Sequence, residues 1–170
     1  GLGNIGAAIA RRGFYGFNMN IIYHNRREKL EMAQPLNAQY KSLEELLQQS
    51  DFVVVAVDLN SDSKALISTE QFALMKKHAV FINIARGSVV DEQALIEALQ
   101  QKQIFAAGLD VYQREPLQES PLFQLDNVVT LPHIGSATAE TRKKMAELAY
   151  QNLIDALEDR TPRYLVNSDF

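Results

Sequence analysis

The sequence predicts an α/β fold: a doubly wound parallel sheet with helices between successive strands. Three observations support this fold class. Short apolar runs alternate with helical patterns from one end of the chain to the other, and the apolar runs are rich in Val and Ile. In addition, 170 residues with 46% hydrophobic and 22% charged side chains are enough for one ordinary globular domain.

Strands are predicted where short apolar runs contain many β-branched residues. They cover residues 19–23, 51–57, 79–85, 104–111 and 127–131. The run at 51–57 is continuous rather than alternating, which is typical of a strand buried on both faces of a parallel sheet.

Helices are predicted between these strands from apolar spacing and from capping residues. They cover residues 4–14, 26–33, 72–75, 91–101 and 138–158, with a further helix that starts at Ser42. Ser42 forms a capping box with Glu45, and Ser68 begins a second one. Asp91 is a good N-cap. Strands that alternate with helices of this length indicate βαβ units and therefore a parallel sheet.

Residues 1–6, with the sequence GLGNIG, match the G-x-G-x-x-G pattern of dinucleotide-binding turns. The pattern needs glycine for a tight turn, for close approach to a pyrophosphate and for packing of the next helix. The N–H groups that open this helix then bind the phosphates. Alone, the motif fits a plain glycine-rich turn equally well. The cofactor-binding residues it predicts are Gly1, Gly3, Asn4, Ile5 and Gly6.

The position that reads the adenosine ribose falls at His24, directly after a predicted strand. NAD-specific sites usually carry Asp or Glu there. This chain instead has His24, Asn25, Arg26 and Arg27, with no carboxylate to repel a 2′-phosphate and two guanidinium groups to bind it. The alternative is a solvated helix start. We favour NADPH over NADH, because cations are poorly placed at a helix N-terminus unless an anion binds there.

Arg86, Glu115 and His133 each follow one of the last three predicted strands. Ligands of open parallel sheets bind beyond the carboxyl ends of the strands, so these side chains are expected on one edge. There Arg86 would bind the carboxylate of a 2-keto acid, His133 would protonate its carbonyl oxygen, and Glu115 would orient the His. Each residue alone would more often have a structural role. Their joint placement favours a catalytic site.

Asp110 is the last of the chemically informative positions, because its carboxylate ends an otherwise apolar strand. Such a group needs a partner, and a nicotinamide carboxamide is one. No metal site is expected, and the absence of Cys excludes disulfides and thiolate ligands.

These stretches together resemble the D-isomer-specific 2-hydroxyacid dehydrogenases over essentially the whole chain. The matching segments are residues 1–6, 83–95, 107–111, 115–116 and 132–138. The resemblance implies a Rossmann-type domain in which Arg86 binds substrate, His133 is the acid–base residue and Glu115 pairs with it. It also places Asp110 beside the nicotinamide. The further residues expected at the cofactor are Val57, Ala85, Arg86, His133 and Gly135.

Within that family, residues 25–27 and 140–142 are most similar to the branch of glyoxylate/hydroxypyruvate and 2-ketogluconate reductases, which generally prefer NADPH. One departure is the sequence Asp58, Leu59, Asn60, where relatives usually have Pro-Leu-Thr near the cofactor. A dinucleotide-sensing corepressor is the main alternative. Phosphoglycerate, lactate, formate or phosphite as substrate is a second one.

The remaining expectations concern setting and extent. A net charge of −4 argues against nucleic acid as a partner, and no apolar run or leader indicates a membrane or secretion. We expect a cytoplasmic homodimer. The chain starts inside the glycine motif, so we expect it to lack the first strand and the substrate domain. Residues 1–136 would then be the Rossmann domain and 137–170 a C-terminal helix and tail, unstable and without turnover when expressed alone.

Overall fold

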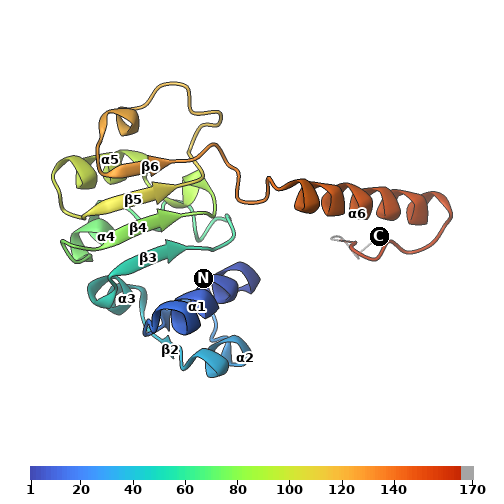
Figure 1. Cartoon of the computed structure of the whole chain (residues 1–170), viewed down its shortest axis with the longest axis horizontal. Helices are drawn as coiled ribbons and strands as arrows, with labels where there is room; N and C mark the ends of the chain where they lie inside the picture. The colour runs from blue at the N-terminus through green and yellow to red at the C-terminus, as the bar shows by residue number, and fades with distance from the viewer. Residues whose placement is uncertain (166–170) are drawn as a thin grey trace. The chain divides into compact units, whose positions relative to one another are not determined.

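The computed structural model describes residues 1–165, and the chain divides into two compact units, Gly1–Pro132 and His133–Phe170 (Figure 1). The strands described all lie in the first unit and pair in parallel. They are β1 (Ile22–Tyr23), β2 (Gln39–Tyr40), β3 (Phe52–Val55), β4 (Val80–Asn83), β5 (Ala106–Leu109) and β6 (Val128–Thr130). The α/β fold with a parallel sheet is therefore confirmed.

The strands form two separate sheets. One has the order β1-β2 and the other the order β3-β4-β5-β6. Strand β2 was not predicted, because it has two exposed residues and no apolar pattern. Helix α1 (Asn4–Phe17) bridges the two sheets: Gly6 lies beside Ala56 after β3, and Gly13 beside Ile21 before β1.

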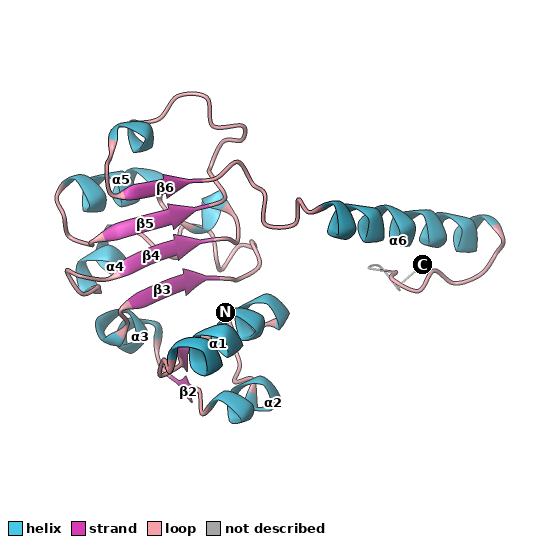
Figure 2. Ribbon diagram, viewed as in Figure 1, coloured by secondary structure: helices cyan, strands magenta, loops and turns pink. Residues whose placement is uncertain are grey.

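The strands of the larger sheet end in one row. Val55 pairs with Asn83, Asn83 with Leu109, and Leu109 with Thr130. Figure 2 shows the four arrows pointing toward the same edge. Residues that directly follow these strands therefore share that edge, as the sequence predicted.

Local signals place the helices that connect the strands. In addition to α1, these are α2 (Leu30–Ala33), α3 (Leu43–Gln49), α4 (Thr69–Leu74) and α5 (Glu92–Gln100). The capping box of α3 forms as predicted, with reciprocal hydrogen bonds between Ser42 and Glu45 of 3.0 and 3.1 Å. Asp91 accepts hydrogen bonds from the first turn of α5, which confirms it as an N-cap. At Ser68, the Gln71 side chain accepts from the backbone N–H at 3.1 Å.

Two clusters of buried side chains hold the first unit together. The larger one lies between the β3–β6 sheet and helices α3, α4 and α5, which lie along one face of that sheet (Figure 1). Its centre includes Phe72 and Phe81, whose rings meet edge to face at 5.2 Å. The smaller cluster consists of Leu2, Ala7, Tyr23 and Ala33. The prediction that β3 is buried on both faces is wrong, because Val53 and Val55 are buried whereas Phe52 is exposed and Val54 only half-buried.

The helix predicted over residues 26–33 begins only at Leu30. Residues 26 and 27 form a bend, since the chain after β1 is held by tertiary hydrogen bonds rather than by helical ones. The Lys29 N–H donates to the Tyr23 hydroxyl at 3.1 Å, and the Asn25 carbonyl accepts from Tyr40 at 2.9 Å. Arg26 and Arg27 are therefore not at a helix N-terminus, and no helix dipole there favours the 2′-phosphate of NADPH.

The second unit consists mainly of α6 (Ala139–Leu157). Thr138 caps it by accepting from the Thr141 N–H at 3.1 Å, and Lys144 pairs with Glu140 one turn away. None of its residues is buried. No helix in residues 1–165 is both long and apolar enough to cross a membrane. The expectation for the C-terminal tail extends over residues 166–170, which lie outside the described part of the chain.

Candidate functional site

The three glycines of residues 1–6 have different surroundings. A Cβ atom on Gly1 would lie 2.6 Å from the Ala56 carbonyl oxygen, and one on Gly6 would lie 1.9 Å from the Gly1 carbonyl oxygen. A Cβ on Gly3 would meet nothing within 4 Å. The first and third positions are therefore closed by backbone, and the second is open at the start of α1. This is the arrangement that a pyrophosphate approaching a helix N-terminus requires.

The turn is fastened to the end of β1. The Gly1 nitrogen donates to the His24 carbonyl at 2.8 Å, and the Leu2 N–H donates to the Asn25 side-chain oxygen at 2.6 Å. His24 and Asn25 thus lie beside the glycine turn, at the position predicted to read the ribose. The Asn25 side chain therefore stabilises the glycine turn, in addition to any contact with a ligand.

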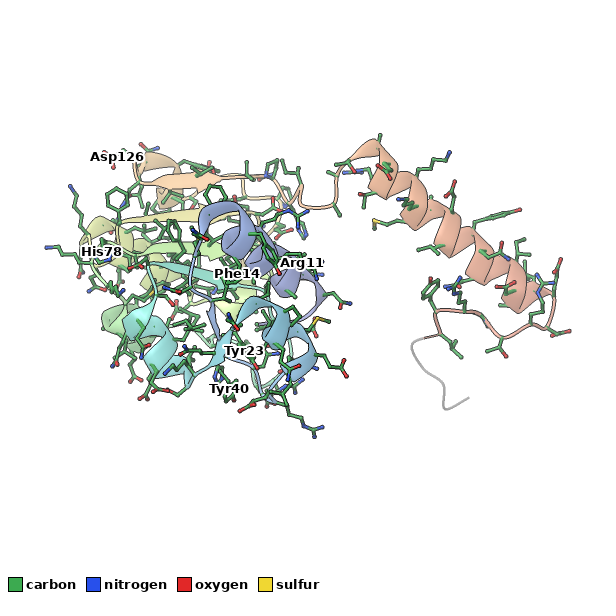
Figure 3. All side chains as sticks on the ribbon, turned by 60° about the horizontal axis from the view of Figure 1, so that its bottom comes forward. Arg11, Phe14, Tyr23, Tyr40, His78 and Asp126 are labelled. Carbon is green, nitrogen blue, oxygen red and sulfur yellow. The ribbon has the colours of Figure 1, made fainter. Side chains whose placement is uncertain are left out.

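The His24 ring is held from two sides. It stacks on Tyr40 with ring centroids 5.9 Å apart, and its Nδ1 lies 2.9 Å from the Lys41 carbonyl oxygen. A carbonyl only accepts, so Nδ1 carries the proton in this hydrogen bond. Tyr40 also meets Tyr23 edge to face at 5.5 Å (Figure 3). The short strand β2, which sequence reasoning missed, therefore supplies the ring that orients His24.

Arg26 lies 3.7 Å from Asp62, and both side chains are about three-quarters exposed, at 76% and 70%. Asp62 belongs to the loop after β3, two residues after the segment 58–60. That loop is fixed by its own side chains: the Asn60 oxygen accepts from the Ser63 N–H, and the Ser63 hydroxyl donates to the Asp58 carbonyl at 2.6 Å. Residues 24–27 and 58–63 thus come together near the glycine turn.

Asn83 shapes the turn that carries Arg86. It is almost fully buried at the end of β4; its side-chain oxygen accepts from the Ala85 N–H at 3.0 Å, and its amide donates to the Arg86 carbonyl at 3.2 Å. Arg86 is exposed, and its guanidinium donates to the Ala85 carbonyl at 2.6 Å. The role of Asn83 was missed. The sequence feature that could have indicated it is a carboxamide at the end of an otherwise apolar strand.

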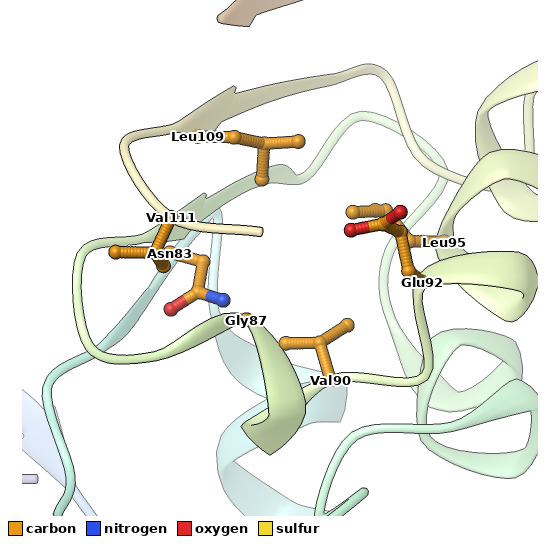
Figure 4. Close-up of a pocket in the computed structure, with 7 residues that line it drawn as sticks. All are labelled: Asn83, Gly87, Val90, Glu92, Leu95, Leu109 and Val111. Carbon is orange, nitrogen blue, oxygen red and sulfur yellow. The ribbon is translucent and has the colours of Figure 1, made fainter. Parts of the chain in front are cut away.

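Glu115 and Tyr112 follow β5 on the same edge. The Tyr112 N–H donates to the Glu115 carboxylate at 3.0 Å. Gly87, next to Arg86, packs so closely on Tyr112 that a Cβ would lie 1.8 Å from the Tyr112 carbonyl carbon. The structure therefore brings the Arg86 and Glu115 segments into contact. A small pocket between them, lined by Asn83, Gly87, Val90, Glu92, Leu95, Leu109 and Val111, has room for about one water molecule and not for a substrate (Figure 4).

The other predicted cofactor residues of the first unit lie along this edge. Val57 would contact a Cβ on Gly1 at 3.0 Å, and Ala85 is buried directly before Arg86. Asp110 is buried and its N–H donates to the Asn83 carbonyl at 3.0 Å. Asp110 has a polar interaction within the chain. Its burial therefore does not by itself indicate a contact with the nicotinamide carboxamide.

His133 and Gly135 belong to the second unit. His133 comes directly after Pro132, is exposed, and has a backbone φ of 55°. Non-glycine residues seldom adopt this left-handed conformation, and those that do are concentrated at functional sites. Among residues 1–165, no group of three His, Asp or Glu side chains has the arrangement of a metal site.

A parallel sheet with polar residues along its carboxyl edge and a glycine turn at a helix N-terminus defines a dinucleotide-binding domain. The chain belongs to the D-isomer-specific 2-hydroxyacid dehydrogenases: residues 1–135 match the model of the NAD-binding domain of that family. The expected cofactor class, NAD or NADP, is confirmed by this assignment.

Individual relatives agree with the family. The chain is 52% identical over 168 residues to glyoxylate/hydroxypyruvate reductase B of Escherichia coli O6:H1, covering 98% of this chain and 52% of that one. The structure superimposes on a glyoxylate reductase from Paecilomyes thermophila with a TM-score of 0.85 and 42% identity, covering 93% of this chain and 48% of the other. It also superimposes on an NADPH-dependent glyoxylate/hydroxypyruvate reductase from Sinorhizobium meliloti, in complex with NADP and malonate, with a TM-score of 0.85 and 36% identity, covering 92% of this chain and 48% of the other. The chain thus spans about half the length of the relatives it matches.

Proposed function

We propose that the complete protein reduces small 2-keto acids, such as glyoxylate and hydroxypyruvate, to D-2-hydroxy acids with NADPH. The observation that carries the proposal is the shared edge of β4 and β5, where Arg86 and Glu115 follow strands in register, while the glycine turn packs on Ala56 after the neighbouring strand β3. The names of the relatives support the substrate class. An oxidoreductase acting on CH–OH groups is the corresponding enzyme class.

The residues present fit a bound dinucleotide. Gly3 leaves open space for the pyrophosphate, and the N–H groups of Asn4, Ile5 and Gly6 open the 14-residue helix α1. When bound, the reduced nicotinamide supplies the hydride that the carbonyl carbon accepts. Residues of this chain perform the remaining tasks.

Arg86 binds the substrate carboxylate through its planar guanidinium and polarises the neighbouring carbonyl. His133 gives its proton to the carbonyl oxygen as that oxygen gains negative charge, so the product is a neutral hydroxyl. Glu115 stabilises the protonated form of His133 before the transfer. In this assignment His133 is the general acid, and its removal costs the most rate.

The preference for NADPH depends on residues 24–27. At the ribose position the chain has His24 instead of a carboxylate, and the His24 ring is fixed by Tyr40 and Lys41. Arg26, two residues further along the chain, is exposed and forms an exposed ion pair with Asp62. Binding of a 2′-phosphate would replace this ion pair. Exposed ion pairs are weak, so the exchange costs little.

The test is an activity panel on the complete protein with glyoxylate, hydroxypyruvate and 2-ketogluconate, each with NADPH and NADH. We expect turnover with NADPH above that with NADH, and we expect the double variant Arg26→Ala/Arg27→Ala to raise the KM for NADPH about 10-fold or more while leaving that for NADH nearly unchanged. Faster turnover with NADH would contradict the role of the two arginines. No turnover with any keto acid would contradict the enzymatic assignment. The same preparation tests the proposed homodimer by its mass in solution.

A further inference from the structure

We infer that Tyr112 is a positioning residue, which holds in place the segments that carry Arg86 and Glu115 and the end of β6, the strand that precedes His133 in the chain. The inference rests on the proposed function. It follows from three contacts made by this one residue, each to a different segment. Tyr112 was not among the candidate site residues, since its sequence position after β5 gives no sign of what its side chain reaches.

The first contact is made by the phenol. Its hydroxyl donates to the Leu131 carbonyl at 2.8 Å and lies 3.2 Å from the Leu109 carbonyl. A phenol has one proton, and Leu131 is the nearer acceptor. Leu131 is two residues before His133, so this bond fixes the end of β6 from which the segment carrying His133 continues.

The phenol is suited to a permanent donor role. Tyr112 is buried, with 7% of its surface exposed, and burial raises the pKa of its hydroxyl. It therefore keeps its proton over the working pH range of most enzymes. The Thr130 side chain hydrogen-bonds to the same hydroxyl and adds a second tie to β6.

The other two contacts are made by the Tyr112 backbone. Its N–H donates to the Glu115 carboxylate at 3.0 Å, which sets the direction of that side chain. Its carbonyl packs against Gly87, where there is no room for even a methyl group. The segment after Arg86, the Glu115 carboxylate and the end of β6 are therefore all set by one residue.

The discriminating variant is Tyr112→Phe in the complete protein, because it removes only the hydroxyl and leaves both backbone contacts. We expect kcat with glyoxylate to fall about 10-fold, since small misplacement of a reacting group is costly, while the Kd for NADPH stays within about twofold. The kinetic isotope effect on kcat with 4-deuterated NADPH should increase, because chemistry becomes more rate-limiting. A merely structural role would lower the melting temperature without raising the isotope effect.

Two further variants complete the experiment. Tyr15→Phe is the matched control, because it removes an exposed hydroxyl that also donates to a backbone carbonyl, that of Pro35 at 3.1 Å. It should keep the wild-type kcat. Thr130→Val is the second probe. We expect a smaller fall in kcat than in Tyr112→Phe, and again an increase in the isotope effect. This variant tests the inference even if Tyr112→Phe does not fold.

The outcomes separate the inference from the proposed function. Wild-type kcat and isotope effect in both Tyr112→Phe and Thr130→Val would overturn the inference. If His133→Ala also retains wild-type kcat, the proposed function itself fails. If His133→Ala is inactive while Tyr112→Phe is unaffected, only the positioning role of Tyr112 is lost.

Discussion

The first unit contains two regions that differ in how their side chains are packed. The strand-end region, residues 42–132, is built around the large cluster that includes Phe72, Phe81 and Leu99. The cofactor-loop region, residues 1–41, has the small cluster and a two-stranded sheet of two residues per strand. The first carries Arg86 and Glu115. The second carries the glycine turn and residues 24–27.

The difference indicates a division of labour. Arg86 and Glu115, which are proposed to act on the substrate and on His133, follow strands of a well-buried sheet, where their segments are packed before any ligand arrives. Residues proposed to bind the cofactor extend from a thinly packed region whose local opening costs less free energy. A ligand that binds only the closed form stabilises such a region by mass action.

The largest effect is expected from the strand-end region. Phe81→Ala removes a fully buried ring from the centre of the large cluster and should lower the free energy of unfolding by about 3–5 kcal/mol. Urea unfolding monitored by circular dichroism measures it. Phe105→Ala is the control, because that ring is 66% exposed and its removal should change stability by less than about 0.5 kcal/mol. Equal losses in the two variants would contradict the assignment of the core.

Gly6→Ala tests the cofactor-loop region. The new methyl group would lie 1.9 Å from the Gly1 carbonyl oxygen, so the turn must shift, at a cost of about 1–3 kcal/mol. The Kd for NADPH should then rise about 10- to 100-fold in calorimetric titration. Gly16→Ala in the same helix has no neighbour within 4 Å and should bind NADPH normally, with slightly higher stability. Normal binding by Gly6→Ala would show that this turn does not hold the phosphates.

Hydrogen exchange compares the two regions directly. Amides of α1 and of β1 should exchange faster than those of β4 and β5 in the absence of cofactor. With NADPH at about 100 times its Kd, the cofactor-loop amides should gain up to about 2.7 kcal/mol of protection. The strand-end amides should gain less, and uniform protection before and after addition would remove the distinction between the regions.

The smallest effect concerns the surface at the start of β3. Two hydrogen bonds, the larger effect from Lys76 and the smaller from His78, lower the pKa of the Asp51 carboxyl below its usual 3.8. A depressed folded-state pKa contributes stability above the unfolded value, and this contribution is lost as the pH falls through the folded one. Asp51→Asn should therefore show a shallower loss of stability below about pH 4, and nearly wild-type stability at pH 7, because the pair is exposed. Thermal melts at pH 3 and pH 7 measure both.

The parts of the fold predicted from sequence are those with local causes. The capping box at Ser42 and the N-cap at Asp91 depend on residues two or three positions away. The apolar runs located five of the strands, with ends displaced by up to three residues because pairing, not composition, ends a strand. Strand β2 and the late start of α2 have no local cause. They follow from Tyr23, Tyr40 and Asn25 contacting one another across turns.

The same division applies to the site. Arg86, Glu115 and His133 were proposed from the sequence because parallel strands deliver their following residues to one edge, which is a rule of topology. Asn83 and Tyr112 were not, since their importance comes from hydrogen bonds to carbonyls and carboxylates that a linear sequence does not pair. Candidates for positioning residues therefore come from coordinates, and candidates for reacting residues come from sequence patterns.

One measurement tests the central claim most directly: the rate of glyoxylate reduction by the complete protein with His133→Gln, measured together with NADPH binding. The account predicts a fall in kcat of about 10²- to 10⁴-fold with the Kd for NADPH unchanged, because only the proton donor is lost. Reduction at the wild-type rate by this variant would contradict it.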